Sequence, residues 1–471
     1  MRKAGAVAVF WCGLAWSAFV VGSAAFGQSP TDEALEKLQK KIDALEQRLA
    51  DQEAKNRRLE DKIEALTRPA AAQPQGPAQA APQAVQAQPA PQPAQAESGA
   101  QKVKAPAETY PLSSTSKIQL YGYLRLDAAY ETSATYPGDY TLWVKPYPAT
   151  GERQPEFHET ANQSRFGLNF SLPESGDIKT RGKVEIDFYG GGAENKANPM
   201  MRHAYMVFEW PQYHFEVLAG QTSDVISPLT PPTLYYSVAW FQGNIGYRHP
   251  QIRLTKSVPT GDHSAWNFQF ALVRPMGREL VDRRTGPDSA HPDLQGRIAY
   301  SFPGGGGQAA SVGLSGHWGQ ETYNAHTAEE HTTWITSSSV DLDWTFPLAK
   351  RLLLTGEAYS GRDLDAFYGG SDQAVNFEKG IATASSGGWL ALALKASPEW
   401  TWNLGVGADD PKNSDLTEGA RSRNRIAFAN MMYAFTKSAL LGFEVSYMDT
   451  QYLGKQNAHA MRGQLAFQYS F

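Results

Sequence analysis

Gln464-Leu465-Ala466-Phe467-Gln468-Tyr469-Ser470-Phe471 ends the chain of 471 residues, and its apolar and polar side chains alternate. A period of two residues is typical of a β-strand whose two faces meet different surroundings. In a soluble protein such a strand would expose an aromatic face and an open sheet edge. In a membrane, a closed barrel removes the open edge and turns the aromatic face toward lipid. The stretch therefore predicts a strand of a membrane-spanning β-barrel.

The composition agrees with a barrel rather than with a bundle of membrane helices. Hydrophobic residues make up 41% of the chain and charged residues 19%, which is polar for a helical membrane protein. After the N-terminus there is no apolar run of about 18 residues, the length that a spanning helix needs. The formal net charge of −5 does not decide the function, because acidic loops can coexist with a basic pore.

Residues 1–27 are predicted to be a secretory signal peptide. Arg2 and Lys3 precede the apolar stretch 4–25, and a cleavage site of small residues lies before Gln28. A retained membrane anchor is the alternative. The only cysteine, Cys12, lies inside this segment, so we expect no disulfide or thiol chemistry in the mature chain.

Residues 31–68 are predicted to form a coiled coil. Apolar residues recur in steps of three and four from Leu35 to Leu66, with charged residues of both signs between them. The pattern favours a homo-oligomer, and a single amphipathic helix lying on another surface is the alternative. Gln52 and Asn56 place two polar layers in the seam, and such layers influence the number of strands.

Residues 69–110 are mostly Ala, Gln and Pro and are predicted to be a linker, because they cannot form a packed core. Residues 116–471 are predicted to form the barrel. We expect a 16-stranded antiparallel transmembrane β-barrel in an all-β fold, with fourteen or eighteen strands as alternatives. The predicted strands are 117–128, 162–172, 178–190, 201–210, 213–220, 250–258, 264–274, 294–302, 308–319, 332–346, 350–361, 386–396, 399–407, 422–435, 438–449 and 458–471.

The connections between these strands are of two lengths. Short turns such as 173–177 and 303–307 alternate with long loops at 131–161, 221–249, 275–293 and 362–385. Outer-membrane barrels have short periplasmic turns and long external loops. An even number of strands places both ends of the barrel at the periplasmic side, so we expect the coiled coil in the periplasm.

A barrel of this size leaves a water-filled channel, so passive permeation is the expected function. If the aromatic face of the last strand meets lipid, Arg462 must face water, and the same alternation assigns earlier residues to the channel. The residues predicted to line the pore are Arg125, Arg165, Arg181, Lys183, Arg202, Arg253, Arg423 and Arg425. The arginine fork suits carboxylate solutes.

Acidic residues are expected to neutralise part of this lining. The candidates are Glu185, Asp187, Asp341, Asp343 and Glu357. Arg421, Arg423 and Arg425 recur every second residue, which predicts that they share one face of a strand. The alternative is that the arginines form structural ion pairs or lie at the mouths of the barrel.

The segment from Gly220 to Arg253 is predicted to contain a loop that folds inward and narrows the pore. It is long and carries Tyr235, Tyr236, Trp240 and Phe241. The alternative is an aromatic surface that packs against a neighbouring protomer.

No motif for catalysis or cofactor binding is present in the sequence. We expect no enzyme activity, no cofactor, no metal and no nucleic-acid partner. His326 and His331 have no third ligand nearby in the sequence, and His317 with Ser315 is a weak candidate for a hydrolytic pair.

The order of several short motifs resembles the DcaP-like porins of Gram-negative bacteria. These motifs are Leu120-Tyr-Gly-Tyr-Leu-Arg125-Leu-Asp127, Ser164-Arg-Phe-Gly167, Gly182-Lys-Val-Glu-Ile-Asp-Phe188, Arg202-His-Ala-Tyr205, Gly220-Gln-Thr222 and Pro250-Gln-Ile-Arg253. The terminal strand is also similar to the C-terminal strand of bacterial outer-membrane barrels. The resemblance implies trimers in the outer membrane, a periplasmic coiled coil, and uptake of small anions such as dicarboxylates through an arginine-rich constriction.

Two other functions remain open from the sequence. Phosphate-selective porins can also carry N-terminal coiled coils, but they use lysine-rich linings. A structural anchor that is tethered through its coiled coil is the alternative from a different class.

Overall fold

The structure is a computed structural model that describes residues 109–111, 116–193, 196–275, 289–323 and 333–471. The chain divides into two units, residues 1–90 and 91–471, and the described residues all belong to the second unit. The predicted signal peptide, the coiled coil and the linker before Thr109 lie outside the described residues. Among the described residues, no helix is long and apolar enough to span a bilayer.

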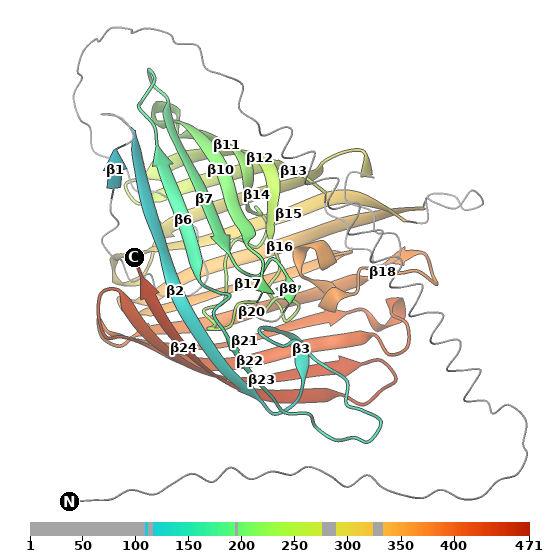
Figure 1. Ribbon diagram of the computed structural model, residues 1–471. Helices are drawn as coiled ribbons and strands as arrows, with labels where there is room; N and C mark the ends of the chain where they lie inside the picture. Colours follow the sequence, from blue (N-terminus) through green and yellow to red (C-terminus); the bar gives the residue numbers. More distant parts are fainter. Residues whose placement is uncertain (1–108, 112–115, 194–195, 276–288, 324–332) are drawn as a thin grey trace, which may run out of the picture. The chain divides into compact units, whose positions relative to one another are not determined.

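The second unit is a closed antiparallel β-barrel (Figure 1). Successive barrel strands pair with each other, and β2 pairs with β24 to close the sheet. The sheet has 18 strands, of which β5 and β6 together occupy one position beside β2, while β1 is a short addition at the edge of β2. Leaving out β1 and counting β5 with β6 gives the sixteen barrel strands that the sequence predicts.

The strands of the barrel have the following bounds. They are β2 (Lys117–Glu131), β5 (Glu156–Thr160), β6 (Arg165–Ser171), β7 (Lys179–Asp187), β10 (Met200–Trp210), β11 (Phe215–Ser223), β12 (Arg248–Gly261), β13 (Ser264–Val273), β14 (Asp293–Pro303), β15 (Ala309–Tyr323), β16 (Thr333–Ala349), β17 (Leu352–Arg362), β20 (Ala384–Lys395), β21 (Trp400–Pro411), β22 (Arg421–Ala434), β23 (Ala439–Tyr452) and β24 (Ala458–Ser470).

Short elements lie at the edge of the sheet and in the connections. The strands are β1 (Thr109–Pro111), β3 (Thr135–Pro137), β4 (Thr141–Val144), β8 (Gly192–Ala193), β9 (Lys196–Ala197), β18 (Val375–Asn376) and β19 (Ile381–Ala382). The 3₁₀ turns are η1 (Pro211–Tyr213), η3 (Gly305–Gly307), η4 (Asp365–Phe367), η5 (Gly370–Asp372) and η6 (Asn413–Asp415).

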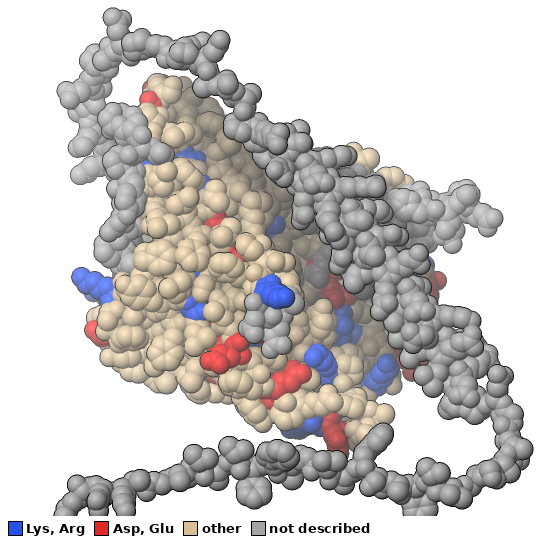
Figure 2. Space-filling view, in the orientation of Figure 1, with Lys and Arg blue, Asp and Glu red and all other residues tan. Residues whose placement is uncertain are grey.

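The two faces of the barrel strands differ in the way the terminal stretch predicts. In β24, Phe467 is 55% exposed, whereas Arg462 is only 1% exposed. Large apolar side chains are exposed on the outer face of neighbouring strands too, which is the surface that a bilayer covers. Figure 2 shows that the outer face over β2, β6 and β7 is largely uncharged, with charged side chains gathered nearer the loop that contains β3. The prediction that Arg462 points away from lipid is confirmed.

Barrel closure depends on contacts between the first and last barrel strands. Glu131 of β2 is the register partner of Arg462 of β24, and their side chains form an ion pair inside the barrel. Gly122 allows the chain end to approach: a Cβ at this position would lie 2.2 Å from the carbonyl oxygen of Arg165 and 3.0 Å from the Phe471 ring. The C-terminal aromatic residue therefore packs at the seam as well as ending the strand.

The main departure from the predicted strands lies between residues 131 and 161. This region was expected to be one long loop, but it contains the β3–β4 hairpin and β5, which pairs with the end of β2. A turn interrupts the strand between β5 and β6, where the Ser164 N–H donates to the Ala161 carbonyl at 2.9 Å. Because charged residues surround Phe157, the sequence lacks the regular alternation that would have predicted β5.

Candidate functional site

The long connection between β11 and β12, residues 224–247, lies inside the barrel. We call it the constriction loop. Its backbone N–H groups donate to inward-facing side chains of three distant strands: Val225 to Gln295 at 2.8 Å, Leu229 to Glu357 at 2.7 Å and Leu234 to Glu444 at 2.8 Å. The acceptors belong to β14, β17 and β23, so the loop follows the inner wall across much of the barrel.

The four aromatic residues predicted in this loop are all buried within the chain. Tyr235 packs in a cluster with Val144 and Met448, and the other three pack in a second cluster with Leu142 and Trp143. The second cluster contains Tyr236, Trp240 and Phe241. The rings therefore join the constriction loop to the β3–β4 hairpin of the same protomer, which leaves them unavailable as a surface for a neighbouring protomer.

Six of the predicted pore-lining residues lie on one continuous part of the barrel, from β2 to β12. We call this set the cationic wall. It consists of Arg125, Arg165, Arg181, Lys183, Arg202 and Arg253. On β2, the buried Arg125 lies between Leu124 and Leu126, which are exposed on the outer face. The alternation that begins at the terminal strand thus extends to this side of the barrel.

Two residues of the cationic wall reach the constriction loop directly. The Arg125 guanidinium donates to the Leu234 carbonyl and pairs with Asp127 at 2.7 Å. The Nη1 of Arg202 lies 3.4 Å from the Tyr236 hydroxyl. Burial raises the pKa of Tyr236 above its ordinary value, so this phenol stays protonated and neutral beside the arginine.

Arg165, Lys183 and Arg202 converge on one carboxylate. Glu185 lies 2.8 Å from the Nε of Arg202, 3.3 Å from the Nζ of Lys183 and 3.5 Å from the Nε of Arg165. Arg202 also pairs with Asp187 at 2.7 Å. Cations outnumber carboxylates at this point of the described wall, which gives it a local positive charge.

Arg181 and Arg253 have different surroundings. Arg181 pairs with Glu209 at 2.7 Å and with Glu216 at 3.0 Å, in a part of the wall where these side chains are about a third exposed. Arg253 donates to neutral acceptors, the side-chain oxygen of Gln251 and the carbonyl of Ser223. Because Ser223 directly precedes the constriction loop, Arg253 lies at the base of that loop.

Asp224 holds the base of the constriction loop. Its carboxylate accepts from the backbone N–H of Tyr247 at 2.8 Å and contacts the His249 ring at 2.7 Å. Burial acts to raise the pKa of Asp224, but His249 and the hydrogen bonds outweigh it and hold the pKa below its ordinary value. A charged Asp224 therefore ties the two ends of the loop together.

Arg423 and Arg425 do not lie on the channel side, so their prediction as pore-lining residues is wrong. They alternate with the buried Asn424 and Ile426, and their side chains are 41% and 46% exposed. Arg423 pairs with Asp410 and Arg425 with Asp449 on neighbouring strands.

A change of register explains why the three arginines of this segment do not share a face. The pairing of β22 with β23 shifts between Arg421 and Arg423. Arg421 is mostly buried and lies over the Trp143 ring at 3.9 Å, whereas the two later arginines point outward. A β-bulge breaks the period of two on which the prediction depended.

The acidic residues of the opposite wall, from β16 to β23, have a different role from the expected one. Glu357 accepts from Leu229 of the constriction loop and from the Trp389 indole at 2.9 Å, and Asp341 accepts from Ser227 of the loop. The carboxylate of Asp343 accepts two hydrogen bonds from the Arg297 guanidinium. We call Asp341, Asp343, Glu357 and Glu444 the acidic wall. Three of these four residues bind the constriction loop, and the fourth, Asp343, pairs with Arg297.

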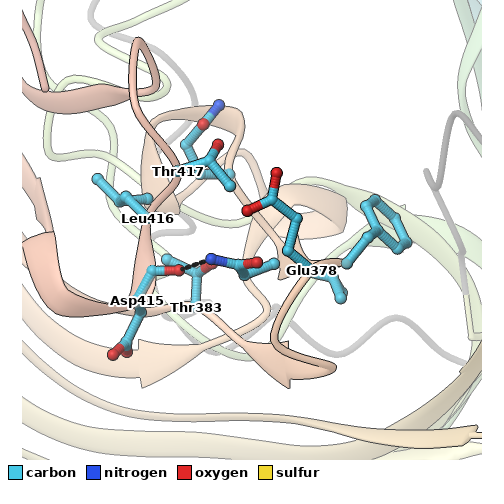
Figure 3. A pocket seen from close by; sticks show the side chains of 9 residues that line it. Glu378, Thr383, Asp415, Leu416 and Thr417 are labelled. Atoms are coloured by element: carbon cyan, nitrogen blue, oxygen red, sulfur yellow. Dashed lines mark hydrogen bonds between the residues drawn. The ribbon is translucent and has the colours of Figure 1, made fainter. Parts of the chain in front are cut away.

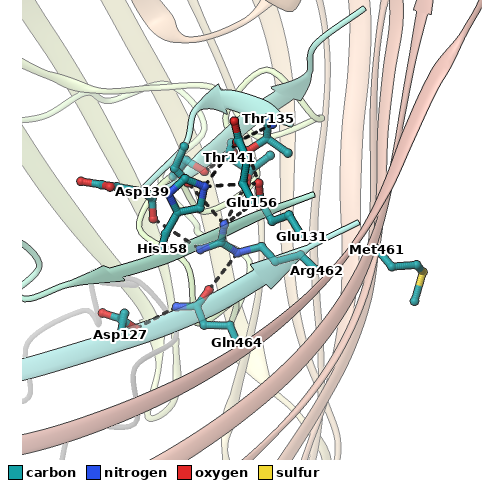
Figure 4. A network of polar contacts seen from close by, with 12 residues as sticks. Asp127, Glu131, Thr135, Asp139, Thr141, Glu156, His158, Met461, Arg462 and Gln464 are labelled. Atoms are coloured by element: carbon teal, nitrogen blue, oxygen red, sulfur yellow. Dashed lines mark hydrogen bonds and ion pairs between the residues drawn. The ribbon is translucent and has the colours of Figure 1, made fainter. Parts of the chain in front are cut away.

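A polar network lies inside the closure seam, at the loop end of β2 and β24 (Figure 4). Glu131 accepts from Arg462, from Thr135 at 2.7 Å and from Thr141 at 2.9 Å. Met461 points to the opposite side of its strand from Arg462. The network fixes the loop between β2 and β5 to the inside of the barrel.

One group of side chains in this network has the composition of a metal site. Glu131, Glu156 and His158 each offer a ligand atom, and these atoms lie within 4.8 Å of one another. Two cations already compete for the carboxylates, because Arg462 pairs with Glu131 and Lys145 lies 3.6 Å from Glu156. The donor set is therefore better explained by ion pairing, and it does not support a metal site.

A pocket of about 200 Å³ lies among the long loops, and its lining includes no residue of the constriction loop (Figure 3). Its lining combines apolar residues such as Leu416 with Glu378 and Asp415. The Asn376 amide donates to the Asp415 carbonyl at 2.7 Å and closes one side. We assign it no role in permeation.

The described residues give little support to the histidines considered as metal ligands or as part of a hydrolytic pair. His326 and His331 lie outside them. The His317 ring contacts Ser337 and Ser339 rather than Ser315, and the Phe367 ring covers it at 4.3 Å.

Two further lumenal residues were not singled out from the sequence. Glu444 anchors the constriction loop and Arg297 pairs with Asp343. Both are polar residues on the buried face of strands whose other face is apolar, so alternation along β14 and β23 could have found them.

No protein-family model matches the chain, and no curated protein matches its sequence. Among solved structures, the crystal structure of the outer membrane channel DcaP of Acinetobacter baumannii matches with a TM-score of 0.61 at 20% identity, covering 77% of this chain and 99% of that chain. The anion-selective porin from Comamonas acidovorans gives 0.49 at 13% identity, covering 76% and 100%. Salmonella typhi OmpF gives 0.49 at 11% identity, covering 77% and 100%.

The sequence motifs indicate a resemblance to DcaP-like porins, and the structure confirms this resemblance at the level of the fold. The DcaP channel is matched over nearly its whole length. The protein is a 16-stranded β-barrel with the fold of the DcaP-like porins.

Proposed function

We propose that the protein is an outer-membrane porin that allows small anionic solutes to diffuse through its barrel. The observation that carries this proposal is the convergence of Arg165, Lys183 and Arg202 on Glu185, next to the constriction loop. An excess of positive charge in a narrow aqueous passage concentrates anions and repels cations. Arg253, with its neutral acceptors, extends the positive field to the base of the loop.

Carboxylates, dicarboxylates among them, are the proposed solute class. The guanidinium groups of the cationic wall can donate two parallel hydrogen bonds to a carboxylate. The resemblance to DcaP-like porins favours the same class. Phosphate remains the competing solute, because the guanidinium fork also fits phosphate oxygens.

The location and the oligomeric state of the protein are part of the same proposal. We propose that it lies in the bacterial outer membrane as a homotrimer, with residues 31–68 forming a coiled coil in the periplasm. Deleting residues 31–68 should leave the conductance of each pore unchanged if the segment acts only in assembly or spacing.

Reversal potentials in planar bilayers test the proposed function. With a gradient of potassium chloride, the potential should have the sign of anion preference, and potassium succinate should give a higher anion permeability than potassium phosphate. Cation preference at neutral pH would contradict the anion path. Equal permeabilities for succinate and phosphate would remove the carboxylate preference.

A further inference from the structure

Glu185 is surrounded by groups that ordinarily bind a carboxylate solute. Besides the three cations, the Tyr121 hydroxyl donates to its Oε2 at 2.7 Å. Glu185 is 2% exposed as a residue, so protein groups form most of the surroundings of its carboxylate. A carboxylate solute in the channel would form hydrogen bonds with the same donors.

The cations around Glu185 are not fully satisfied by it. Arg202 divides its guanidinium between Glu185 and Asp187, but the Nε of Arg165 is buried and has no hydrogen-bond partner. The Arg165 guanidinium lies over the Tyr123 ring at 5.2 Å and the Lys183 ammonium over the Tyr121 ring at 5.3 Å. These rings hold both cations beside Glu185, and the Nε of Arg165 remains able to donate to a second anion.

The exposed edge of this cluster consists of cations. The side chains of Arg165 and Lys183 are each 11% exposed, whereas that of Glu185 is 3% exposed. A solute in the channel therefore meets the two cations before the carboxylate. It can take over part of their coordination without removing Glu185 from the wall.

A channel for diffusion needs a site that binds its solute weakly. Hydrogen bonds to charged groups are among the strongest in proteins, so several cations without a competing carboxylate would hold a carboxylate solute too long. Conduction requires binding that is favourable enough for entry and weak enough for exit. A resident carboxylate that competes with the solute meets this requirement.

We propose that Glu185 acts as an internal competitor for the carboxylate-binding site formed by Arg165, Lys183 and Arg202. The inference rests on the proposed anion permeation and assigns Glu185 the role of setting solute affinity. Glu185 keeps the three cations in place and shares them with each passing carboxylate.

The test is the dependence of single-channel conductance on potassium acetate concentration, in the full-length protein and in Glu185→Gln. Removing the competing charge should lower the half-saturating acetate concentration by at least about threefold, a change of affinity well within that of one charged contact. The anion permeability ratio should rise as well. Glu216→Gln removes the same charge from the same wall but beside Arg181, and it should change the half-saturating concentration less.

Glu185→Asp provides a second measurement if the Gln variant does not fold, as judged by the mobility of unheated samples in gels. It keeps the charge but withdraws the carboxylate by one methylene, so the half-saturating concentration should fall by a smaller factor. An unchanged or higher half-saturating concentration in a folded variant, with an anion-selective wild type, would overturn the role of Glu185 alone. A cation-selective wild type would instead overturn the proposed function.

Discussion

The two walls of the barrel use charged residues in opposite ways. On the cationic wall, Arg165, Lys183 and Arg202 gather around Glu185 and keep an exposed edge toward the channel. On the acidic wall, Glu357 and Glu444 are buried and accept hydrogen bonds from the backbone of the constriction loop. One wall therefore keeps cations at its exposed edge, while the other holds the constriction loop in place.

The comparison teaches that charge facing the inside of a barrel need not face the passage. The acidic side chains were expected to neutralise the cationic lining across the pore. Asp341 and Glu357 instead bind the constriction loop, so they contribute less to the field in the passage than an exposed carboxylate would, whereas Glu185 and Asp187 pair with the cations as expected. The carboxylates of the cationic wall itself, such as Glu185 and Asp187, offset most of its charge and leave a small local excess of cations.

Arg202→Gln should have the largest effect on stability. It removes the cation shared by the buried carboxylates of Glu185 and Asp187, and breaking a buried pair in this way costs about 3–5 kcal/mol. The variant should unfold at a clearly lower temperature, measured by circular dichroism in detergent. Arg181→Gln is the matched control, because its partners are about a third exposed and their loss costs less than about 1 kcal/mol. Equal losses in the two variants would contradict the distinction.

Glu357→Leu should have the next largest effect and should separate the roles of the walls. It leaves the Leu229 N–H and the Trp389 indole N–H without their acceptor, at a cost of about 1–3 kcal/mol for each group. The constriction loop should become mobile, so single-channel recordings should show larger and noisier conductance with little change in reversal potential. A large change of selectivity with constant conductance would mean that Glu357 acts on solutes directly.

The sequence predicts the barrel well and assigns several arginines to its inside, because both depend on alternation. The terminal strand from Gln464 to Phe471 defines the lipid face, and strands β2, β6, β7 and β12 follow the same period. Arg125, Arg165 and Arg253 could therefore be assigned to the inside without a structure. The inward path of the aromatic loop was predictable from its length and composition.

The sequence fails where the period of two is broken or where contacts cross the barrel. The bulge next to Arg421 places it on the opposite face from Arg423 and Arg425, and no residue type in that segment marks it. The pairing of Glu357 with Leu229 joins residues 128 positions apart in the chain. Such contacts depend on the path of the loop, which alternation along one strand cannot reveal.

The most direct test of the cationic wall compares two single arginine substitutions that remove the same charge. Arg165→Gln acts at the cluster around Glu185, whereas Arg423→Gln acts on the outer face, where the side chain pairs with Asp410. Both should fold, because Glu185 keeps Lys183 and Arg202 as partners when Arg165 is replaced, and the outer pair is exposed, worth about 0–1 kcal/mol. The reversal potential in a potassium chloride gradient should move toward cation preference in Arg165→Gln and stay at the wild-type value in Arg423→Gln. Equal shifts in the two variants, or a shift only in Arg423→Gln, would contradict the account.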